Sequence, residues 1–265
     1  MRRLCAAWAG FQCCGPFGRV DLASAVRTDP VLVRGHVQSV HLYGVTNAQP
    51  VIVSSGDGGW VHLGPHVAEV LAARGYFVVG FDVRAYLTGF TKAMATLRAD
   101  DEPSDLRTIS DYASHFRRSK PILVGISEGA GLSVLAASDP ITQQSIAGVI
   151  GIGLPDRNEI GGRLRDSIVY LTHGVSSEPT FSAAAVVGKV SPLPLALLHS
   201  THDDYVPLAD AQRMMGLGSE PKRLWVVRAS DHRFSDNLSG FDRSLLEAVD
   251  WVGQNQPRTM AVQTQ

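Results

Sequence analysis

The heptapeptide Gly-Ile-Ser-Glu-Gly-Ala-Gly at residues 125–131 carries the strongest chemical signal of the chain. It follows the apolar run Pro-Ile-Leu-Val at 121–124 and precedes a run of small residues, which predicts a strand, a tight turn and a helix. A G-x-S-x-G turn of this kind strains the backbone of its serine, here Ser127, and exposes the hydroxyl at the end of a sheet. Glycine is required at Gly125 and Gly129, because a Cβ there would crowd the strand against the helix. Ser127 is therefore a candidate nucleophile.

A carboxylate and a histidine follow in the order that such a turn predicts, namely serine, acid and histidine, each after a strand. Asp203 comes after the apolar run 193–199 and begins the sequence Asp-Asp-Tyr-Val-Pro, which favours it as the acid. Asp204 is the alternative acid, because a shift of one residue decides which carboxylate faces the site. His232 follows the strand pattern 223–228 and is the candidate base. The competing interpretations are a helix N-cap role for Asp203 and an ordinary loop position for His232.

A glycine-rich loop, Gly-Asp-Gly-Gly-Trp at 56–60, follows the apolar strand pattern at 51–55. Acyl transfer needs two backbone N–H groups aimed at the oxyanion that develops during the reaction. One should come from Glu128, the residue after the candidate nucleophile, and the other from Asp57 or Gly58 in this loop. A phosphate-cradling loop is the competing interpretation, but the Gly-Lys-Ser/Thr ending and the G-x-G-x-x-G spacing of such loops are missing.

These residues predict ester hydrolysis through an acyl-enzyme, in which His232 takes the proton of Ser127 and Asp203 orients the imidazole. The sequence does not separate an esterase from a thioesterase or a peptidase. The alternative class is a non-catalytic binding protein that keeps the fold as a scaffold, since a fold does not guarantee activity.

Five residues near the candidate acid and base also suggest a metal cluster: His199, His202, Asp203, Asp204 and His232. Histidine and carboxylate groups are ordinary zinc ligands. However, the chain has no H-E-x-x-H motif, and the strand setting accounts for Asp203 and His232 without a metal. We therefore expect neither a metal nor a cofactor, and a small-molecule or lipid ester as substrate.

Strand and helix patterns alternate along the chain, which predicts an α/β protein with the α/β-hydrolase fold, a mostly parallel central sheet with helices on both faces. The expected strands are 37–45, 50–55, 77–82, 121–126, 146–154, 192–200 and 224–228. The expected helices are 61–74, 104–118, 128–138, 208–216 and 237–255. In the second of these helices, Ser104 is the expected capping residue and Asp105 belongs to the expected polar face.

The α/β-hydrolase domain should span residues 36–255, with 1–35 as an N-terminal tail or degenerate leader and 256–265 as a C-terminal tail. Two segments without clear periodicity, 86–103 and 155–189, interrupt the pattern and are expected to shape substrate choice. The second is polar and partly basic. Its arginines are interpreted as solvated loop residues or, alternatively, as binders of an anionic headgroup.

The composition fits one folded domain. The chain has 265 residues, of which 45% are hydrophobic and 18% charged, which is ordinary for a globular protein. A formal net charge of −1 gives no overall attraction to nucleic acid or to an anionic membrane. No apolar run approaches the roughly 18 to 20 residues of a membrane span.

The first residues of the chain do not determine the cellular compartment of the protein. All 3 cysteines, Cys5, Cys13 and Cys14, lie there, so the expected domain has none. The charged start and apolar stretch at 1–11 have the shape of a signal peptide, but the stretch is short and no A-x-A cleavage site follows.

The loop 55–60, Ser-Gly-Asp-Gly-Gly-Trp, together with 75–82, Gly-Tyr-Phe-Val-Val-Gly-Phe-Asp, and the serine turn, resembles the VirJ/AcvB bacterial virulence-protein family. The resemblance covers roughly residues 38 to 255. It implies an α/β-hydrolase domain, a periplasmic location and a serine hydrolase acting on aminoacylated phosphatidylglycerol, with peripheral membrane contact as an expected partner interaction. A cytoplasmic location is the alternative, and the oligomeric state stays open.

The chain departs from the family pattern at two places. The family commonly has an aromatic residue after the nucleophile and an Asp after Gly-Ala, where this chain has Glu128 and Gly131. The family's Leu-Arg-Tyr-Phe-Trp-like stretch is replaced by Val-Arg-Ala-Tyr-Leu at 83–87. The substrate is therefore the least transferable part of the resemblance, and a non-catalytic binding role in a secretion or virulence system is the alternative that it leaves.

Overall fold

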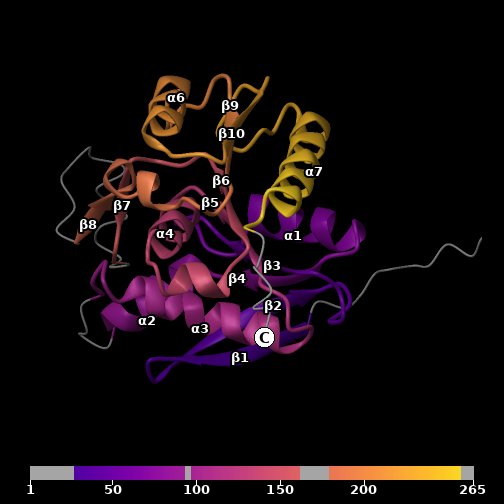
Figure 1. Ribbon diagram of the computed structural model, residues 1–265, viewed down its shortest axis with the longest axis vertical. Helices are drawn as coiled ribbons and strands as arrows, with labels where there is room; N and C mark the ends of the chain where they lie inside the picture. The colour runs from indigo at the N-terminus through magenta and orange to yellow at the C-terminus, as the bar shows by residue number, and fades with distance from the viewer. Residues whose placement is uncertain (1–26, 93–96, 162–178, 258–265) are drawn as a thin grey trace, which may run out of the picture.

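The computed structural model describes residues 27–92, 97–161 and 179–257. Eight strands form one sheet in the order β1-β2-β4-β3-β5-β6-β9-β10 (Figure 1). The antiparallel part comprises β1 (Arg27–Val33), β2 (His36–Tyr43) and the pairing of β2 with β4. The remaining strands are parallel: β3 (Pro50–Ser54), β4 (Phe77–Phe81), β5 (Ile122–Ile126), β6 (Gly148–Ile152), β9 (Leu195–Ser200) and β10 (Lys222–Val227).

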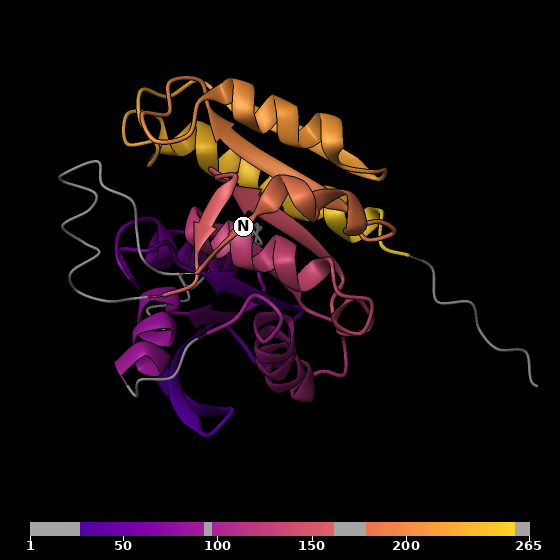
Figure 2. The ribbon, with the colours of Figure 1, turned by 90° about the vertical axis from the view of Figure 1, so that its left-hand side faces the viewer.

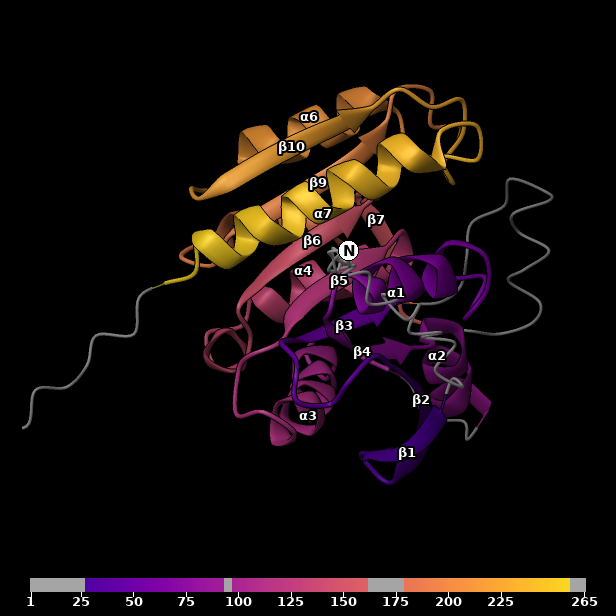
Figure 3. The ribbon, with the colours of Figure 1, turned by 90° about the vertical axis from the view of Figure 1, so that its right-hand side faces the viewer.

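Helices cover both faces of this sheet. On one face lie α1 (Leu63–Ala73) and α7 (Leu238–Gln254). On the other lie α2 (Val83–Lys92), α3 (Glu102–His115), α4 (Glu128–Ala137) and α6 (Leu208–Leu217). Figures 2 and 3, which view the molecule from opposite sides, show these two layers. Each layer encloses its own apolar core against the sheet. The strands β3 to β6 are buried along their whole length, as strands between two helical layers must be.

A short ribbon of two antiparallel strands, β7 (Arg157–Glu159) and β8 (Thr180–Ser182), stands apart from the main sheet. Three short 3₁₀ helices, Thr142–Ser145, Ala183–Ala185 and Val187–Lys189, complete the described elements. None of the helices in the described ranges is long and apolar enough to cross a membrane.

The expected strands and helices are all present, with ends that shift by a few residues. Strand β1 corrects the predicted N-terminal tail, because Arg27–Val33 pairs with β2 along its full length. Residues 27–30 of this strand are exposed or half-exposed, and exposed and buried residues alternate only from Pro30 to Val33. Helix α2 begins at Val83 and occupies part of the segment 86–103, which the sequence pattern had left without structure.

The start of α3 also differs from the expectation. The helix begins at Glu102 after Asp101, so Ser104 lies inside it and is not its cap. Asp105 does not belong to a polar face: it is 1% exposed. Its carboxylate accepts hydrogen bonds from Arg34 Nε and Nη2, each at 2.7 Å, and from the Tyr86 hydroxyl at 2.6 Å. These partners explain the burial, because a paired carboxylate tolerates the interior.

Candidate active site

Ser127 occupies the tight turn between β5 and α4. Its φ of 51° and ψ of −116° are a strained combination for a residue with a side chain. The Ser127 N–H donates to the Ile152 carbonyl at 2.8 Å, which ties the turn to the end of β6. A Cβ at Gly125 would collide with the Gly129 backbone, and one at Gly129 with the Ser54 and Ser55 carbonyls. The two glycines therefore have the steric role expected of them.

Asp203 and His232 meet at the ends of β9 and β10. Nδ1 of His232 lies 2.6 Å from Oδ2 of Asp203, whose side chain is fully buried, whereas the His232 side chain is 13% exposed. Oδ1 of Asp203 accepts the N–H groups of Tyr205 at 2.9 Å and Val206 at 2.8 Å. Burial alone would raise the pKa of Asp203, but the hydrogen bonds from His232 and Val206 outweigh it and lower that pKa. The carboxylate is thus held in its charged form.

The structure also distinguishes the two neighbouring carboxylates. Asp203 faces the ring of His232, whereas the exposed Asp204 accepts the backbone N–H of His232 at 3.2 Å. The alternative interpretation of Asp203 as a helix N-cap is wrong, because α6 follows Pro207 and has no side-chain cap.

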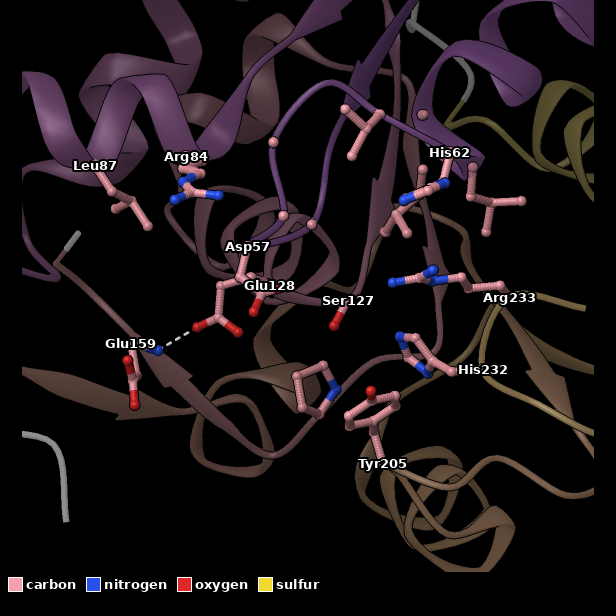
Figure 4. A pocket seen from close by; sticks show the side chains of 18 of the residues that line it. Asp57, His62, Arg84, Leu87, Ser127, Glu128, Glu159, Tyr205, His232 and Arg233 are labelled. Carbon is pink, nitrogen blue, oxygen red and sulfur yellow. Dashed lines mark hydrogen bonds between the residues drawn. The ribbon is translucent and has the colours of Figure 1, made fainter. Parts of the chain in front are cut away.

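Ser127 and His232 line one cavity of about 580 Å³. Figure 4 shows the Ser127 hydroxyl between the His232 ring and the carboxyl group of Glu128. No hydrogen bond joins Ser127 to His232 in the described part of the chain; catalytic hydrogen bonds often form fully only in the complex with substrate. The three residues named from the sequence, including Asp203, thus come together at the C-terminal edge of the parallel strands.

The glycine-rich loop lies beside the serine. A Cβ at Gly56 would be 3.5 Å from the Ser127 Cβ. Trp60 anchors the far end of the loop, because its ring covers Gly80 of β4 and its Nε1 donates to the Tyr43 hydroxyl at 3.2 Å. Among the described residues, the backbone N–H groups of Glu128, Asp57 and Gly58 have no protein acceptor. These residues line the cavity, so the geometry allows the predicted pair of oxyanion donors.

The side chain of Glu128 is an unusual feature of this cavity. It is 7% exposed, and its Oε1 accepts the backbone N–H of Glu159. Burial raises the pKa of Glu128 to about 8, the Glu159 hydrogen bond opposes this, and the charges of Asp57 and Glu159 add to the rise. Three carboxyl groups therefore gather on one side of Ser127, and a cation would be stabilised among them.

Arginines supply the opposite charge. Arg84, Arg157 and Arg233 line the same cavity and are exposed, and the described residues offer them no ion-pair partner. Figure 4 shows Arg233 on the His232 side of Ser127, whereas Arg84, near the start of α2, lies on the side of Asp57 and Glu128. The cavity wall thus carries both carboxyl and guanidinium groups.

Gly131, which departs from the family pattern, has a steric explanation. A Cβ at this position would overlap the side chain of Asn158, which is fully buried. Nδ2 of Asn158 donates to the carbonyls of Pro155 at 3.1 Å and Asp156 at 3.2 Å. An aspartate at position 131 would need the space that Asn158 fills, so the glycine and the loop after β6 are coupled.

The sequence interpretation missed several cavity residues: His62, Arg84, Glu159, Tyr205 and Arg233. Arg84 stands in the stretch 83–87 that departs from the family pattern, and Arg233 and Tyr205 adjoin the predicted residues, so position was an available signal for these three. Nothing in the sequence around Glu159 indicated that its backbone would contact Glu128. Part of the predicted substrate-shaping segments, 93–96 and 162–178, lies outside the described residues, as do the leader at 1–11 and the cysteines.

Comparison with known proteins finds a family whose members are similar to part of this chain. A family model described as "Bacterial virulence protein (VirJ)" matches residues 49–159. The matched region runs from β3 to β7 and contains the glycine-rich loop and Ser127. This confirms the predicted resemblance, over a shorter stretch than the expected 38 to 255.

Among curated proteins, the chain is similar to YfhR of Escherichia coli O157:H7, a protein described as uncharacterized. The two are 28% identical over 202 residues, which cover 70% of this chain and 64% of YfhR. The match therefore spans less than two thirds of that relative's length.

Two solved structures show the fold. Est1E from Butyrivibrio proteoclasticus has a TM-score of 0.64 and 13% identity, and the match covers 86% of this chain and 99% of that chain. A membrane phospholipase A, described as a novel bacterial virulence factor, has a TM-score of 0.63 and 14% identity, over 86% of this chain and 87% of that chain. The predicted α/β-hydrolase fold is confirmed.

Proposed function

We propose that this protein is a serine hydrolase that cleaves a carboxylic ester through an acyl-enzyme. Ser127 Oγ attacks the ester carbonyl while Nε2 of His232 takes its proton. The N–H groups of Glu128 and of Asp57 or Gly58 stabilise the oxyanion. The protonated His232 then gives its proton to the leaving alcohol, and water, deprotonated by the same imidazole, releases the acid and restores Ser127.

The observation that carries this proposal is the buried Asp203 carboxylate 2.6 Å from Nδ1 of His232. This contact leaves Nε2 as the nitrogen available to the cavity that also holds Ser127. A non-catalytic scaffold of the same fold would not need this contact, nor the strained backbone of Ser127.

We further propose an aminoacylated phosphatidylglycerol as the substrate class. The resemblance to the virulence-protein family suggests it, and the distribution of charge in the cavity supports it. The carboxyl groups of Glu128, Asp57 and Glu159 would hold the ammonium of an aminoacyl group. Arg84, Arg157 and Arg233 would accept the lipid phosphate, which guanidinium groups bind well.

The rim of the cavity fits a lipid substrate. Val61 and Tyr205 line the cavity and are 48% and 72% exposed, so apolar surface borders the opening. Together with the arginines, these side chains would contact the anionic surface of a membrane when the lipid enters.

The direct test is incubation of the purified chain with vesicles that contain lysyl-phosphatidylglycerol, without added metal. The measurement is the release of free lysine by mass spectrometry. Wild type should release lysine, and Ser127→Ala should not. Activity in Ser127→Ala equal to wild type would overturn the serine mechanism.

Two further kinds of substrate, p-nitrophenyl butyrate and acyl thioesters, test the hydrolase activity separately from the lipid substrate. Hydrolysis of p-nitrophenyl butyrate with no release of lysine would keep the serine hydrolase and overturn the lipid substrate. Failure on both, and on acyl thioesters, would favour the non-catalytic alternative.

A further inference from the structure

His199 is a buried histidine that the proposed reaction does not use. It lies at the end of β9, four residues before Asp203, and is 1% exposed. Its Nε2 is 2.8 Å from the carbonyl oxygen of Val206. A carbonyl oxygen only accepts hydrogen bonds, so the acceptor assigns the hydrogen of His199 to Nε2.

Val206 is held at two points by the residues around the candidate acid. Its N–H donates to Oδ1 of Asp203 at 2.8 Å, and its carbonyl accepts from His199 at 2.8 Å. Nε2 of His199 also lies 3.7 Å from Oδ2 of Asp203, the oxygen that accepts Nδ1 of His232. Asp203, Val206 and His199 therefore form one closed set of contacts beneath His232.

This arrangement matters because the carboxylate must keep one orientation. If the Val206 backbone moved, Oδ1 of Asp203 would lose a donor and the carboxylate would be free to rotate away from His232. A fully buried carboxylate has no water to replace a lost donor. The hydrogen bond from His199 to the Val206 carbonyl fixes this backbone to the end of β9.

We propose that His199 is a positioning residue, which acts through Val206 to hold the Asp203 carboxylate against His232. The role of this contact in turnover rests on the proposed hydrolase function, but the effect on His232 does not. The groups that contact His232 among the described residues are Asp203 at Nδ1, Asp204 at its backbone N–H, the Tyr205 ring at 5.5 Å between centroids and the backbone of Gly153 against the ring. Among the described residues, His199 reaches His232 only through the turn that contains Asp203 and Val206.

The test compares His199→Leu, which removes the donor, with His199→Gln, whose amide reaches the position of Nε2 and still donates. His199→Leu should lower kcat for p-nitrophenyl butyrate by about 10- to 100-fold, with KM nearly unchanged. The acid limb of its pH–rate profile should move to lower pH, because a misplaced Asp203 stabilises the imidazolium of His232 less well. His199→Gln should restore most of kcat and the position of that limb.

His202→Gln is the matched control, since His202 is exposed and its Nδ1 contacts Thr201 Oγ1 in the same turn. The His202→Gln protein should keep the acid limb of the pH–rate profile at its wild-type position. A His199→Leu protein that melts earlier but keeps the wild-type limb and kcat would overturn the positioning role, and so would a His199→Gln protein with the defect of His199→Leu.

A measurement that does not depend on turnover tests the role of His199 separately from the proposed hydrolase function. The Nδ1–H of His232, held 2.6 Å from Oδ2 of Asp203, should give a strongly downfield nuclear magnetic resonance signal in wild type and His199→Gln. This signal should be lost or move upfield in His199→Leu, whether or not any ester is cleaved. The same Nδ1–H signal in wild type and His199→Leu would overturn the inference even if wild type proves to be an active esterase.

Discussion

The ring of His232 rests directly on the backbone of Gly153. Gly153 follows β6 with a φ of +59°, and a Cβ built on it would overlap Cε1 of His232 and lie 3.0 Å from Nδ1. The absence of a side chain at this one position lets the imidazole lie over the end of β6 and remain in reach of Asp203. Neither the spacing of the motifs nor the G-x-S-x-G turn indicated this requirement.

Gly153→Ala should therefore displace the imidazole and lower kcat/KM for p-nitrophenyl butyrate by about 100-fold. The positive φ adds strain, so a melting curve should accompany the kinetics. Gly253→Ala is the control: Gly253 lies exposed in α7, and a Cβ there meets nothing within 4 Å. If Gly153→Ala kept wild-type kcat/KM, the described position of His232 would not be the one that reacts.

Substitution of the three proposed catalytic residues should show that they act as a unit. Ser127→Ala and His232→Ala should each abolish nearly all ester hydrolysis, and the double variant should be little worse than either. Asp203→Asn should cost about 10³- to 10⁴-fold in kcat. Asp204→Asn should cost less than about tenfold, because the Asp204 carboxylate contacts the backbone N–H of His232 and not its ring. A larger loss of kcat for Asp204→Asn than for Asp203→Asn would show that Asp204, and not Asp203, is the catalytic acid.

Much of the fold followed from the sequence because each parallel strand is a short apolar run that ends in polar or glycine-rich residues. The runs at β3, β5 and β9 lead directly into the loops that carry the site. The antiparallel β1 escaped prediction, because it begins with the polar residues Arg27, Thr28 and Asp29 and alternates between exposed and buried positions only over its last four residues. Asp105 was misplaced because its partner Arg34 lies 71 residues away.

The site was predictable to the extent that it consists of local motifs. The turn at Ser127 and the loop at Asp57 have their own signatures, whereas the choice between Asp203 and Asp204 depends on one residue of register. The contact between Glu128 and the Glu159 backbone joins two segments whose meeting depends on how β7 crosses the start of α4. No periodicity encodes that crossing.

Glu128 should contribute to the choice of substrate. Glu128→Gln keeps the acceptor for the Glu159 N–H and removes a carboxyl group that a bound ammonium would favour in its ionised form. The ratio of kcat/KM for lysyl-phosphatidylglycerol to that for its fully N-acetylated form should fall by about tenfold, because a hydrogen-bonded charge pair is worth about 1.5 kcal/mol or more. An unchanged ratio would show that Glu128 does not read the charge of the acyl group.

The raised pKa of Glu128 also predicts a pH dependence of stability. The pKa is about 8 in the folded protein and 4.5 in the reference state, so between these values the folded form binds more protons than the unfolded form. The free energy of unfolding should therefore fall as pH rises through this window, by up to about 1.4 kcal/mol per pH unit from this group, and level off above pH ~8.

Urea denaturation of wild type and Glu128→Gln at several pH values measures this contribution. The variant lacks the titration, so its stability relative to wild type should increase from pH ~5 to pH ~8. A constant difference across that range would mean that Glu128 titrates normally in the folded protein.

The central claim, that Ser127 is a nucleophile activated by His232 and Asp203, is tested most directly by mass spectrometry of the intact protein after reaction with a fluorophosphonate probe. The account predicts one adduct per chain, formed with loss of fluoride and mapped by peptide digestion to Ser127. It also predicts no adduct in Ser127→Ala and much slower labelling in His232→Ala. An unlabelled wild-type protein, or equal labelling of wild type and Ser127→Ala, would contradict the claim.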